Sequence, residues 1–273
     1  MISADLASCS NDRFEVRVTR SMRDIAAAQA LRFRVFCEEM PSWPSPAMVR
    51  ARRDADEFDD VCDHLIVEDL ARPRGNRAVA TTRMLRQSAT IAHGGFYSAR
   101  EFDIRPLLRS PPQGGELCEI GRSCVHREYR RTGIVQLLWR GLAQYYRTNG
   151  IARVMGCASL PGAGPGDHTV TLSYLYHWHL APLSRRVRAL PGQSLPMNRT
   201  GMDAIDRARA FRLLPPLIKG YLRLGAVVGD GAVVDPRFRT TDVLMTVELD
   251  KVPKRYHVFF GRDRVQEAKA AAG

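Results

Sequence analysis

The sequence predicts an α/β fold in which a mixed β-sheet is flanked by helices, and three consecutive patterns lead to this prediction. Residues 116–133 begin with an apolar strand that carries an acid and an arginine. After an Arg-Arg-Thr-Gly turn, apolar residues recur with a period of about 3.6 residues as far as Thr148, which indicates a helix. Residues 152–159 then form a second apolar run of strand length. Strand, helix and strand in this order are typical of α/β proteins.

The first part of the chain predicts a strand, a helix and a pair of strands. Residues 13–19 alternate apolar and charged side chains, as a half-buried strand does. Ser21 followed by Asp24 is a capping-box pattern for a helix that we expect to run to about Met40. The prolines and acidic residues of positions 41–60 predict an irregular segment. Two strands that pair around a Gly-Asn turn are then expected at 64–68 and 77–85.

The last part predicts an insertion and then a return to regular structure. Residues 161–212 are rich in Pro, Gly, His and Arg, so we expect them to separate the central strand-helix-strand core from the C-terminal strands, with a helical patch at 167–180. Pro216 can begin a helix that ends at Leu224. Residues 240–249 alternate again and predict a final strand.

The composition predicts one globular domain with an acidic partner. With no repeat and no strong linker, we expect residues 1–273 to form a single domain, with its core at about 13–260 and a disordered tail at about 267–273. The net charge of +12 favours binding to nucleic acid, anionic lipid or an acidic carrier protein, without choosing among them. No signal-peptide pattern and no long apolar window occur, so we expect a cytoplasmic protein, soluble or on a membrane surface.

Neither a metal site nor a covalent acyl-enzyme is expected. The six cysteines contain no Cys-x-x-Cys pair, which argues against a zinc site and a disulfide scaffold, so we expect reduced core thiols. The histidines match no metal-binding spacing. Ser98 and Ser159 lack the strand-turn-helix context of a serine nucleophile, and Cys118 and Cys124 lie on a strand without a histidine paired to them.

Glu119 is the candidate catalytic residue on the central strand. A strand that carries a carboxylate, next to a helix whose first N–H groups can hold an anion, suits acyl transfer to an amine. The carboxylate would remove the proton of the amine, and the N–H groups would hold an anionic acyl carrier. The alternative is that Glu119 forms an ion pair with Arg122 or Arg83 that holds two strands together.

The strand-helix-strand core resembles the GNAT (GCN5-related N-acetyltransferase) fold. In that family the loop before the central helix reads Arg/Gln-x-x-Gly-x-Gly/Ala, and its amides hold the pyrophosphate of coenzyme A. Here the loop reads Arg-Arg-Thr-Gly-Ile-Val from Arg130 to Val135. Valine in place of the last small residue narrows this seat, which disfavours tight binding of coenzyme A.

A second resemblance points to a different acyl donor. Positions spread over about ninety residues look like those of the acyl-homoserine lactone synthases, relatives of the GNAT fold that take acyl groups from acyl carrier protein. These positions are Arg32, Phe36, Asp56, Asp59, Arg83, Glu119 and Arg122.

Over nearly the whole chain, from about Arg20 to Phe260, the sequence resembles the ornithine lipid acyltransferases, also called hemolysin-like proteins. The resemblance rests on four stretches, which are Phe-Asp-Asp-Val-Cys-Asp-His-Leu at 58–65, Gly-Phe-Tyr-Ser-Ala at 95–99, Leu-Ser-Tyr-Leu-Tyr-His at 172–177 and Leu-Pro-Pro-Leu-Ile-Lys-Gly-Tyr at 214–221. It implies transfer of a 3-hydroxyacyl group from acyl carrier protein to the α-amino group of ornithine, giving lyso-ornithine lipid.

The donor arm would be the 4′-phosphopantetheine of the carrier protein, with no permanently bound cofactor. Transfer to glutamine, a coenzyme A-dependent acetyltransferase and a non-catalytic basic module that binds lipid or nucleic acid remain as alternatives. The resemblance favours the carrier protein over nucleic acid as partner.

These resemblances and the chemistry together assign roles to the candidate residues. Glu119 would be the base, and Tyr221 would protonate the leaving thiolate, unless it only packs in the core. Arg83 and Arg122 would bind the amino-acid carboxylate, or else balance nearby acids. Asp56 and Asp59 would bind the amine, or else order the first helix through Arg32. The carrier arm would contact Val125, Arg130, Arg131, Thr132 and Gly133.

Basic and apolar residues interleave at 207–223, which suits a helix at an anionic bilayer surface on the inner face of the cell membrane. A core helix is the alternative, because Pro215 and Pro216 interrupt the pattern.

Overall fold

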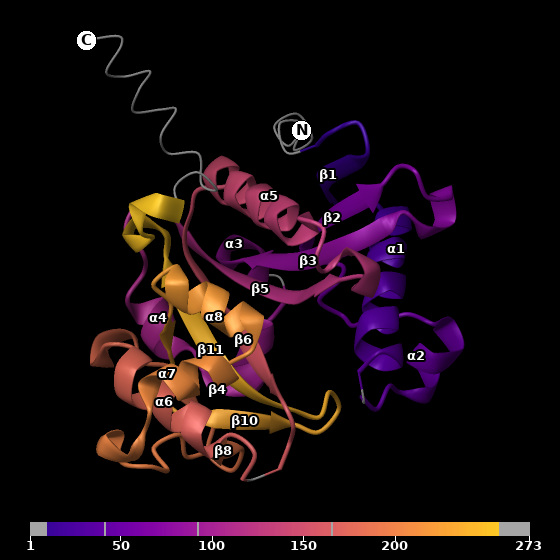
Figure 1. Cartoon of the computed structure of the whole chain (residues 1–273). Helices are drawn as coiled ribbons and strands as arrows, with labels where there is room; N and C mark the ends of the chain where they lie inside the picture. The colour runs from indigo at the N-terminus through magenta and orange to yellow at the C-terminus, as the bar shows by residue number, and fades with distance from the viewer. Residues whose placement is uncertain (1–9, 41, 92, 165, 257–273) are drawn as a thin grey trace, which may run out of the picture. The chain divides into compact units, whose positions relative to one another are not determined.

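The structure is a computed structural model that describes residues 10–40, 42–91, 93–164 and 166–256 (Figure 1). These residues form two compact units, and each is built from segments that are distant in the sequence. The first unit takes its residues from 1–93, 120–151 and 253–273, and the second takes its residues from 94–119 and 152–252. The expectation of a single domain stays a prediction, and its disordered tail at 267–273 lies outside the described residues.

The first unit contains a sheet whose strands are β1 (Phe14–Thr19), β2 (Asp63–Asp69), β3 (Ala78–Arg86) and β5 (Glu116–Val125), in this spatial order. β1 pairs antiparallel with β2, and β2 pairs antiparallel with β3. The pairing confirms the two strands predicted at 64–68 and 77–85. β5 begins in the second unit and enters the first after Glu119.

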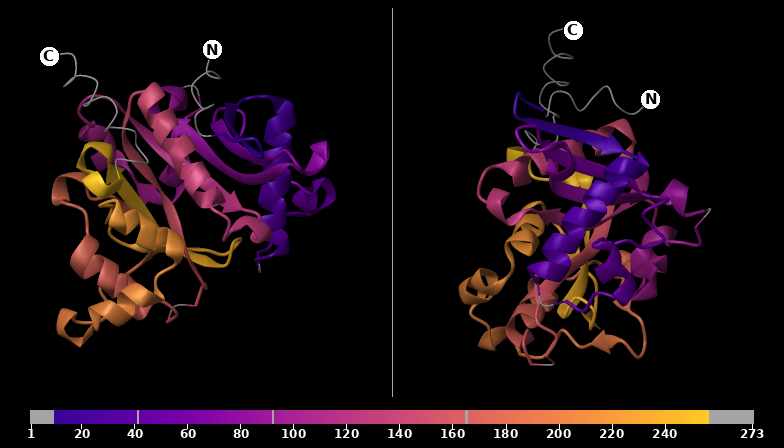
Figure 2. Two further views of the ribbon diagram at one scale, coloured as in Figure 1. Left: turned by 45° about the horizontal axis from the view of Figure 1, so that its top comes forward. Right: turned by 90° about the vertical axis from the view of Figure 1, so that its right-hand side faces the viewer.

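Two long helices cover opposite faces of this sheet, α1 (Met22–Phe33) and α5 (Ile134–Thr148) (Figure 2). Leu31 of α1 belongs to a buried cluster with Ile66 of β2. Helix α5 packs closely against Leu65, the residue before Ile66. A Cβ added to Gly141 of α5 would lie only 2.7 Å from the Leu65 side chain. Successive residues of a strand point to opposite faces, so the two helices lie on opposite sides.

The helix boundaries show how local sequence sets the ends. Ser21 caps α1, and its hydroxyl accepts a hydrogen bond from the Asp24 N–H at 3.2 Å, as the capping pattern predicted. Beyond α1 the chain continues as the π-helix η2 (Arg34–Glu38), so the regular helix ends before the predicted Met40. Gly133 precedes α5 with φ of 84°, a conformation that favours glycine.

The remaining short elements of the first unit are α2 (Pro46–Ala51), η3 (Arg74–Asn76), α3 (Gln87–Thr90), η5 (Arg127–Tyr129) and η9 (Lys254–Tyr256). The prediction that residues 41–60 are irregular is therefore wrong at α2. Ser45 caps this helix and Pro46 begins it, a start signal that the proline count obscured.

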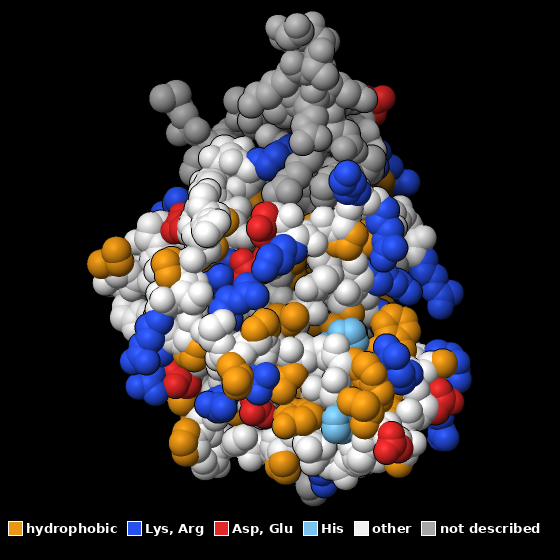
Figure 3. Space-filling view, turned by 90° about the vertical axis from the view of Figure 1, so that its left-hand side faces the viewer, with side chains coloured by type: hydrophobic (Ala, Val, Ile, Leu, Met, Phe, Trp, Pro, Cys, Tyr) orange, Lys and Arg blue, Asp and Glu red, His pale blue; other side chains and the backbone are white. Residues whose placement is uncertain are grey.

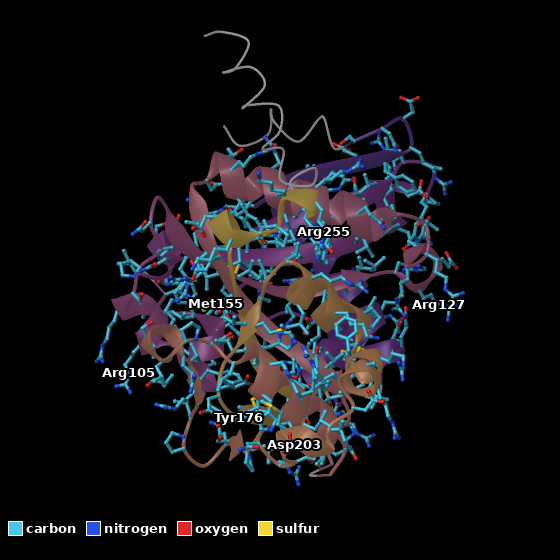
Figure 4. All side chains as sticks on the ribbon, turned by 60° about the vertical axis from the view of Figure 1, so that its left-hand side comes forward. Arg105, Arg127, Met155, Tyr176, Asp203 and Arg255 are labelled. Atoms are coloured by element: carbon cyan, nitrogen blue, oxygen red, sulfur yellow. The ribbon has the colours of Figure 1, made fainter. Side chains whose placement is uncertain are left out.

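The second unit contains a sheet of β6 (Ile151–Pro161), β11 (Thr240–Glu248), β10 (Ala232–Asp235) and β8 (Ser194–Leu195), with β9 (Val227–Val228) paired to β11. β6 and β11 form the longest ladder, antiparallel from Arg153–Glu248 to Pro161–Thr240. Met155 of β6, labelled in Figure 4, is buried. The strands predicted at 152–159 and 240–249 are confirmed.

Helices and a small two-stranded sheet complete the second unit. They are η4 (Tyr97–Arg100), β4 (Phe102–Asp103), α4 (Arg105–Arg109), α6 (Thr169–His179), η6 (Leu183–Arg185), β7 (Arg188–Ala189), η7 (Met202–Ala204), α7 (Arg207–Leu213), α8 (Pro216–Arg223) and η8 (Leu249–Lys251). The predicted helices at 167–180 and from Pro216 are confirmed. β7 to β10 went unpredicted, because strands of two to four residues are too short for a periodic pattern, whereas α7 lies in the segment 207–223 for which the sequence suggested a helix.

Candidate active site

The first unit buries a closed ring of ion pairs in which three arginines alternate with three aspartates. Each arginine contacts two aspartates, and each aspartate contacts two arginines. Around the ring the pairs are Arg32–Asp54 at 3.1 Å, Asp54–Arg122 at 3.3 Å, Arg122–Asp56 at 3.2 Å, Asp56–Arg83, Arg83–Asp59 at 2.9 Å and Asp59–Arg32 at 2.7 Å. We call this set the ion-pair ring, and its formal charges sum to zero.

The ion-pair ring joins four parts of the first unit. Arg32 comes from α1, the three aspartates from the loop before β2, Arg83 from β3 and Arg122 from β5. Arg32 is 1% exposed, so its charge depends on buried partners. Removing one partner from a buried pair leaves an uncompensated charge, which costs far more than breaking an exposed pair. The ring therefore fixes α1 and the aspartate loop against two strands.

The ring also sets the protonation of its members. Burial acts to raise the pKa of Asp56, but the charges of Arg83 and Arg122 outweigh it and hold the pKa below its ordinary value. For Asp59 burial acts in the same direction, and Arg32 and Arg83 again hold the pKa well below the ordinary value. Both carboxylates are thus ionised at neutral pH.

Arg122 is held in a strained conformation. Its φ is 52°, in the left-handed region that costs a non-glycine residue about 1–2 kcal/mol. The ion pairs of its guanidinium with Asp54 and Asp56 hold the side chain at this point of β5. This residue lies three positions after Glu119 on the same strand.

In the second unit, Glu119 is held by neutral donors. Its carboxylate accepts hydrogen bonds from the backbone N–H of Tyr97 and of Ser98, both at 2.8 Å, and from the Ser98 hydroxyl. Glu119 is 5% exposed. Two N–H groups from the start of η4 thus fix the direction of the carboxylate.

A thiol and two further carboxylates lie near Ser98. The Ser98 hydroxyl lies 3.4 Å from Cys157 Sγ, which in turn lies 3.9 Å from a Glu101 carboxylate oxygen. Ligand atoms of Glu101, Cys157 and Asp242 all fall within 4.8 Å of one another. We call Glu101, Glu119, Cys157 and Asp242 the acid cluster.

The acid cluster offers two carboxylates to an ammonium group. Burial raises the pKa of the Cys157 thiol well above its ordinary value, and Asp242 and Glu101 raise it further. An ammonium needs only carboxylates and hydrogen-bond acceptors, which Glu101 and Asp242 supply. The expectation that the protein needs no metal stays a prediction.

The other predicted residues occupy separate places. Tyr221 lies on α8, and burial raises the pKa of its hydroxyl above the ordinary value, so the group keeps its proton. Phe36 packs against the buried cluster of Leu31, Val35 and Ile66.

The predicted carrier-arm segment lies in the first unit, at the start of α5. Arg130 donates to the Val125 carbonyl at 3.0 Å and pairs with Glu39. The Thr132 hydroxyl donates to the Tyr129 carbonyl at 2.9 Å, and Arg131, Thr132 and Gly133 are exposed.

The structure thus brings five predicted residues into the ion-pair ring and places Glu119 in the acid cluster. The pairing of Asp59 with Arg32 confirms the ordering of the first helix that the sequence left open. Asp54, Glu101, Cys157 and Asp242 went unpredicted. The spacing Asp-Ala-Asp-Glu-Phe-Asp at 54–59 could have indicated Asp54, but the other three are brought together only by folding.

Comparison with known proteins gives both sequence relatives and folds. The family "Acetyltransferase (GNAT) domain" matches residues 31–140. A curated L-ornithine N(alpha)-acyltransferase from Rhizobium meliloti is 45% identical over 91% of this chain and 84% of its own length. The proteins of the same name from Brucella abortus and Rhodobacter capsulatus are 44% and 38% identical, over 91% of this chain and over 89% and 95% of their own lengths.

Two solved structures resemble the fold more distantly. The acyl-homoserine lactone (AHL) synthase LasI is 12% identical, with a TM-score of 0.49, and the match covers 92% of this chain and 96% of LasI. The N-acyl amino acid synthase FeeM is 9% identical, with a TM-score of 0.48, over 87% and 92% of the two chains.

Proposed function

The chain belongs to the L-ornithine N(alpha)-acyltransferase family and has a GNAT-like mixed sheet flanked by helices, and from this premise we propose that it transfers a 3-hydroxyacyl group to the α-amino group of ornithine. The product would be lyso-ornithine lipid. The observation that carries the proposal is the 45% identity with a curated relative of that name, spread over 91% of this chain.

The proposed reaction is a direct attack of the amine on a thioester. Glu119 accepts a proton from the α-ammonium, directly or through water, and the free amine attacks the thioester carbonyl. The C–N bond forms, the nitrogen of the tetrahedral intermediate loses its second proton to solvent, and the C–S bond breaks as the intermediate collapses. The released thiolate takes a proton from the hydroxyl of Tyr221 on α8. The two backbone N–H donors at Tyr97 and Ser98 hold the Glu119 carboxylate in place.

The acid cluster supports ornithine over glutamine. Ornithine carries a second ammonium on its side chain, whereas the glutamine side chain ends in a neutral amide. The carboxylates of Glu101 and Asp242 can accept hydrogen bonds from that ammonium and compensate its charge.

We propose acyl carrier protein as the donor, through its 4′-phosphopantetheine arm. The net charge of +12 suits an acidic carrier protein, and the exposed Arg131 with the residues around Gly133 offers basic side chains and N–H groups to a phosphate. Val135, 36% exposed, occupies the position that is small in coenzyme A-binding loops, which favours the carrier protein over coenzyme A. Among the described residues no helix has the length and apolarity to cross a bilayer, and the location we propose is the cytoplasmic face of the cell membrane.

A competition assay tests this function. Purified protein is incubated with 3-hydroxyacyl carrier protein and an equal mixture of ornithine, lysine and glutamine, and the N-acyl products are separated by mass spectrometry. We expect N-acylornithine to dominate. A parallel reaction with the matching acyl-coenzyme A should be slower, and a faster one would replace the proposed donor. If no N-acyl amino acid forms, the proposed function is wrong.

A further inference from the structure

Helices α7 and α8 meet at a corner whose outward side chains are leucines and arginines. Leu213, the last residue of α7, is 58% exposed, and Leu217 in the first turn of α8 is 39% exposed. Only Leu214, Pro215 and Pro216 separate them, so the two apolar side chains lie close in the chain at the same turn.

The opposite sides of the same helices face the core of the second unit. Ala210 of α7 and Ile218 of α8 are fully buried, and Leu214 between the helices is 2% exposed. For residues 207–223 the sequence left open a helix at a bilayer surface and a helix in the core, and each alternative applies to a different face of these helices. One face anchors the helices, and the other presents Leu213 and Leu217 to solvent.

The corner is strongly basic. Residues 207–223 contain five basic residues and no acidic one. Lys219 is half-buried, whereas the four arginines are exposed, and they are Arg207, Arg209, Arg212 and Arg223. On the face shown in Figure 3, hydrophobic side chains gather in the lower half with Lys and Arg side chains among them.

Cation–π contacts hold part of this basic surface against aromatic rings. The Arg207 guanidinium lies 5.0 Å from the ring centre of Trp178 on α6, and Arg223 lies 5.8 Å from that of Phe211. Trp178 and Tyr176 of α6 are half-buried, and Figure 4 labels Tyr176 in this part of the second unit. Tryptophan and tyrosine favour the interface between water and lipid, because their rings are apolar with one polar edge.

We propose that this corner, Leu213 and Leu217 with Arg207, Arg209, Arg212 and Arg223, binds the surface of an anionic lipid bilayer. The arginines match the charge of lipid phosphates, and the leucines enter the boundary between headgroups and acyl chains. This inference rests on the proposed function, since it places the enzyme where a product with a long acyl chain belongs. Charge alone would suit an acidic carrier protein equally, but the exposed Leu213 and Leu217, on helices that also hold Arg207 against the Trp178 ring, favour lipid.

Vesicle sedimentation tests the inference without any acyl donor or amino acid. The intact protein is mixed with vesicles of phosphatidylcholine, or of phosphatidylcholine with 30% phosphatidylglycerol, at low and high salt. We expect binding to the anionic vesicles that weakens at high salt. L213S/L217S and, separately, R209Q/R212Q should each lower the partition coefficient about tenfold or more.

Matched controls come from α1 and α2 of the first unit. M22S/V49S removes exposed apolar side chains, 73% and 51% exposed in the native protein, and R50Q/R52Q makes the same charge change as R209Q/R212Q. Both control variants should bind vesicles like the native chain. Circular dichroism and thermal unfolding check that each variant is folded, and if L213S/L217S unfolds, R209Q/R212Q decides the question.

Three results would overturn the inference. They are equal binding to neutral and anionic vesicles, unchanged vesicle binding by the corner variants, and a raised KM for acyl carrier protein in R209Q/R212Q with vesicle binding intact. The last result would assign the corner to the carrier protein. Because the vesicle assay needs no turnover, a protein that binds vesicles but transfers no acyl group would disprove only the proposed function.

Discussion

The two units each hold buried carboxylates, but they compensate them differently. In the ion-pair ring every aspartate contacts two arginines, so each negative charge has positive neighbours. Glu119 of the acid cluster accepts hydrogen bonds from two backbone N–H groups and a hydroxyl, which are neutral. Paired charges that sum to zero suit a structural role, whereas hydrogen-bond donors that fix the direction of a carboxylate suit proton transfer at a defined place.

The comparison predicts that Glu119→Gln affects turnover more than folding. Because an amide cannot accept the proton of the amine, we expect kcat to fall by about 10²–10⁴-fold. Steady-state assays and thermal unfolding on the same preparation measure both effects. Ser98→Ala is the matched control, because it removes one donor to the carboxylate and leaves the acid. Full activity in Glu119→Gln would remove the proposed base.

In the ion-pair ring the effect should fall on stability. Arg32→Ala leaves Asp54 and Asp59 buried with one positive partner fewer, and we expect a loss of about 3–5 kcal/mol in the free energy of unfolding. Arg52, which pairs with Glu38 and is largely exposed, is the control, and Arg52→Ala should cost about 1 kcal/mol or less. Urea denaturation measures both, and equal costs would contradict a special role for the ring.

The ion-pair ring should also make the free energy of unfolding depend on pH. Because the pKa of Asp59 is lower in the folded chain than its ordinary value, its stabilisation is complete above pH about 4 and is lost as the pH falls through the folded value. Asp59→Asn should therefore flatten the fall of the unfolding free energy below pH about 4, by roughly 1.4 kcal/mol per pH unit at most. Asp60→Asn, at the exposed neighbouring residue, is the control for urea denaturation at a series of pH values. Parallel pH curves for Asp59→Asn and the native chain would exclude the linkage.

Glu101 should affect which amino acid the enzyme prefers. Glu101→Gln removes one charge beside Cys157, so the second ammonium of ornithine loses a charged partner. We expect kcat/KM for ornithine to fall about 10–100-fold, while that for glutamine changes less. Glu116→Gln, on the same unit at the start of β5, is the control. An equal loss for both amino acids would show that Glu101 does not set selectivity.

Periodicity predicted the long elements, and isolated short ones escaped it. The strands at 64–68, 77–85 and 152–159 and the helix before Thr148 are confirmed, because each spans enough residues to show its period. The two-residue strands are too short to show a period, and the seven residues of α7 show less than two full turns of one. Of the ring, the resemblance indicated five of the six residues, and only Asp54 was missed.

The sequence alone determined the order of the main strands and helices, the family and the acid at position 119, because local periodicity and motifs are properties of neighbouring residues. Only the tertiary structure decided which charges are paired. Arg32 and Arg122 come from distant segments and both contact Asp54, and Glu101 and Asp242 come from distant segments and meet in the acid cluster. These contacts depend on how the segments fold together. Burial then sets the energy of each charge, and burial is a property of the folded chain.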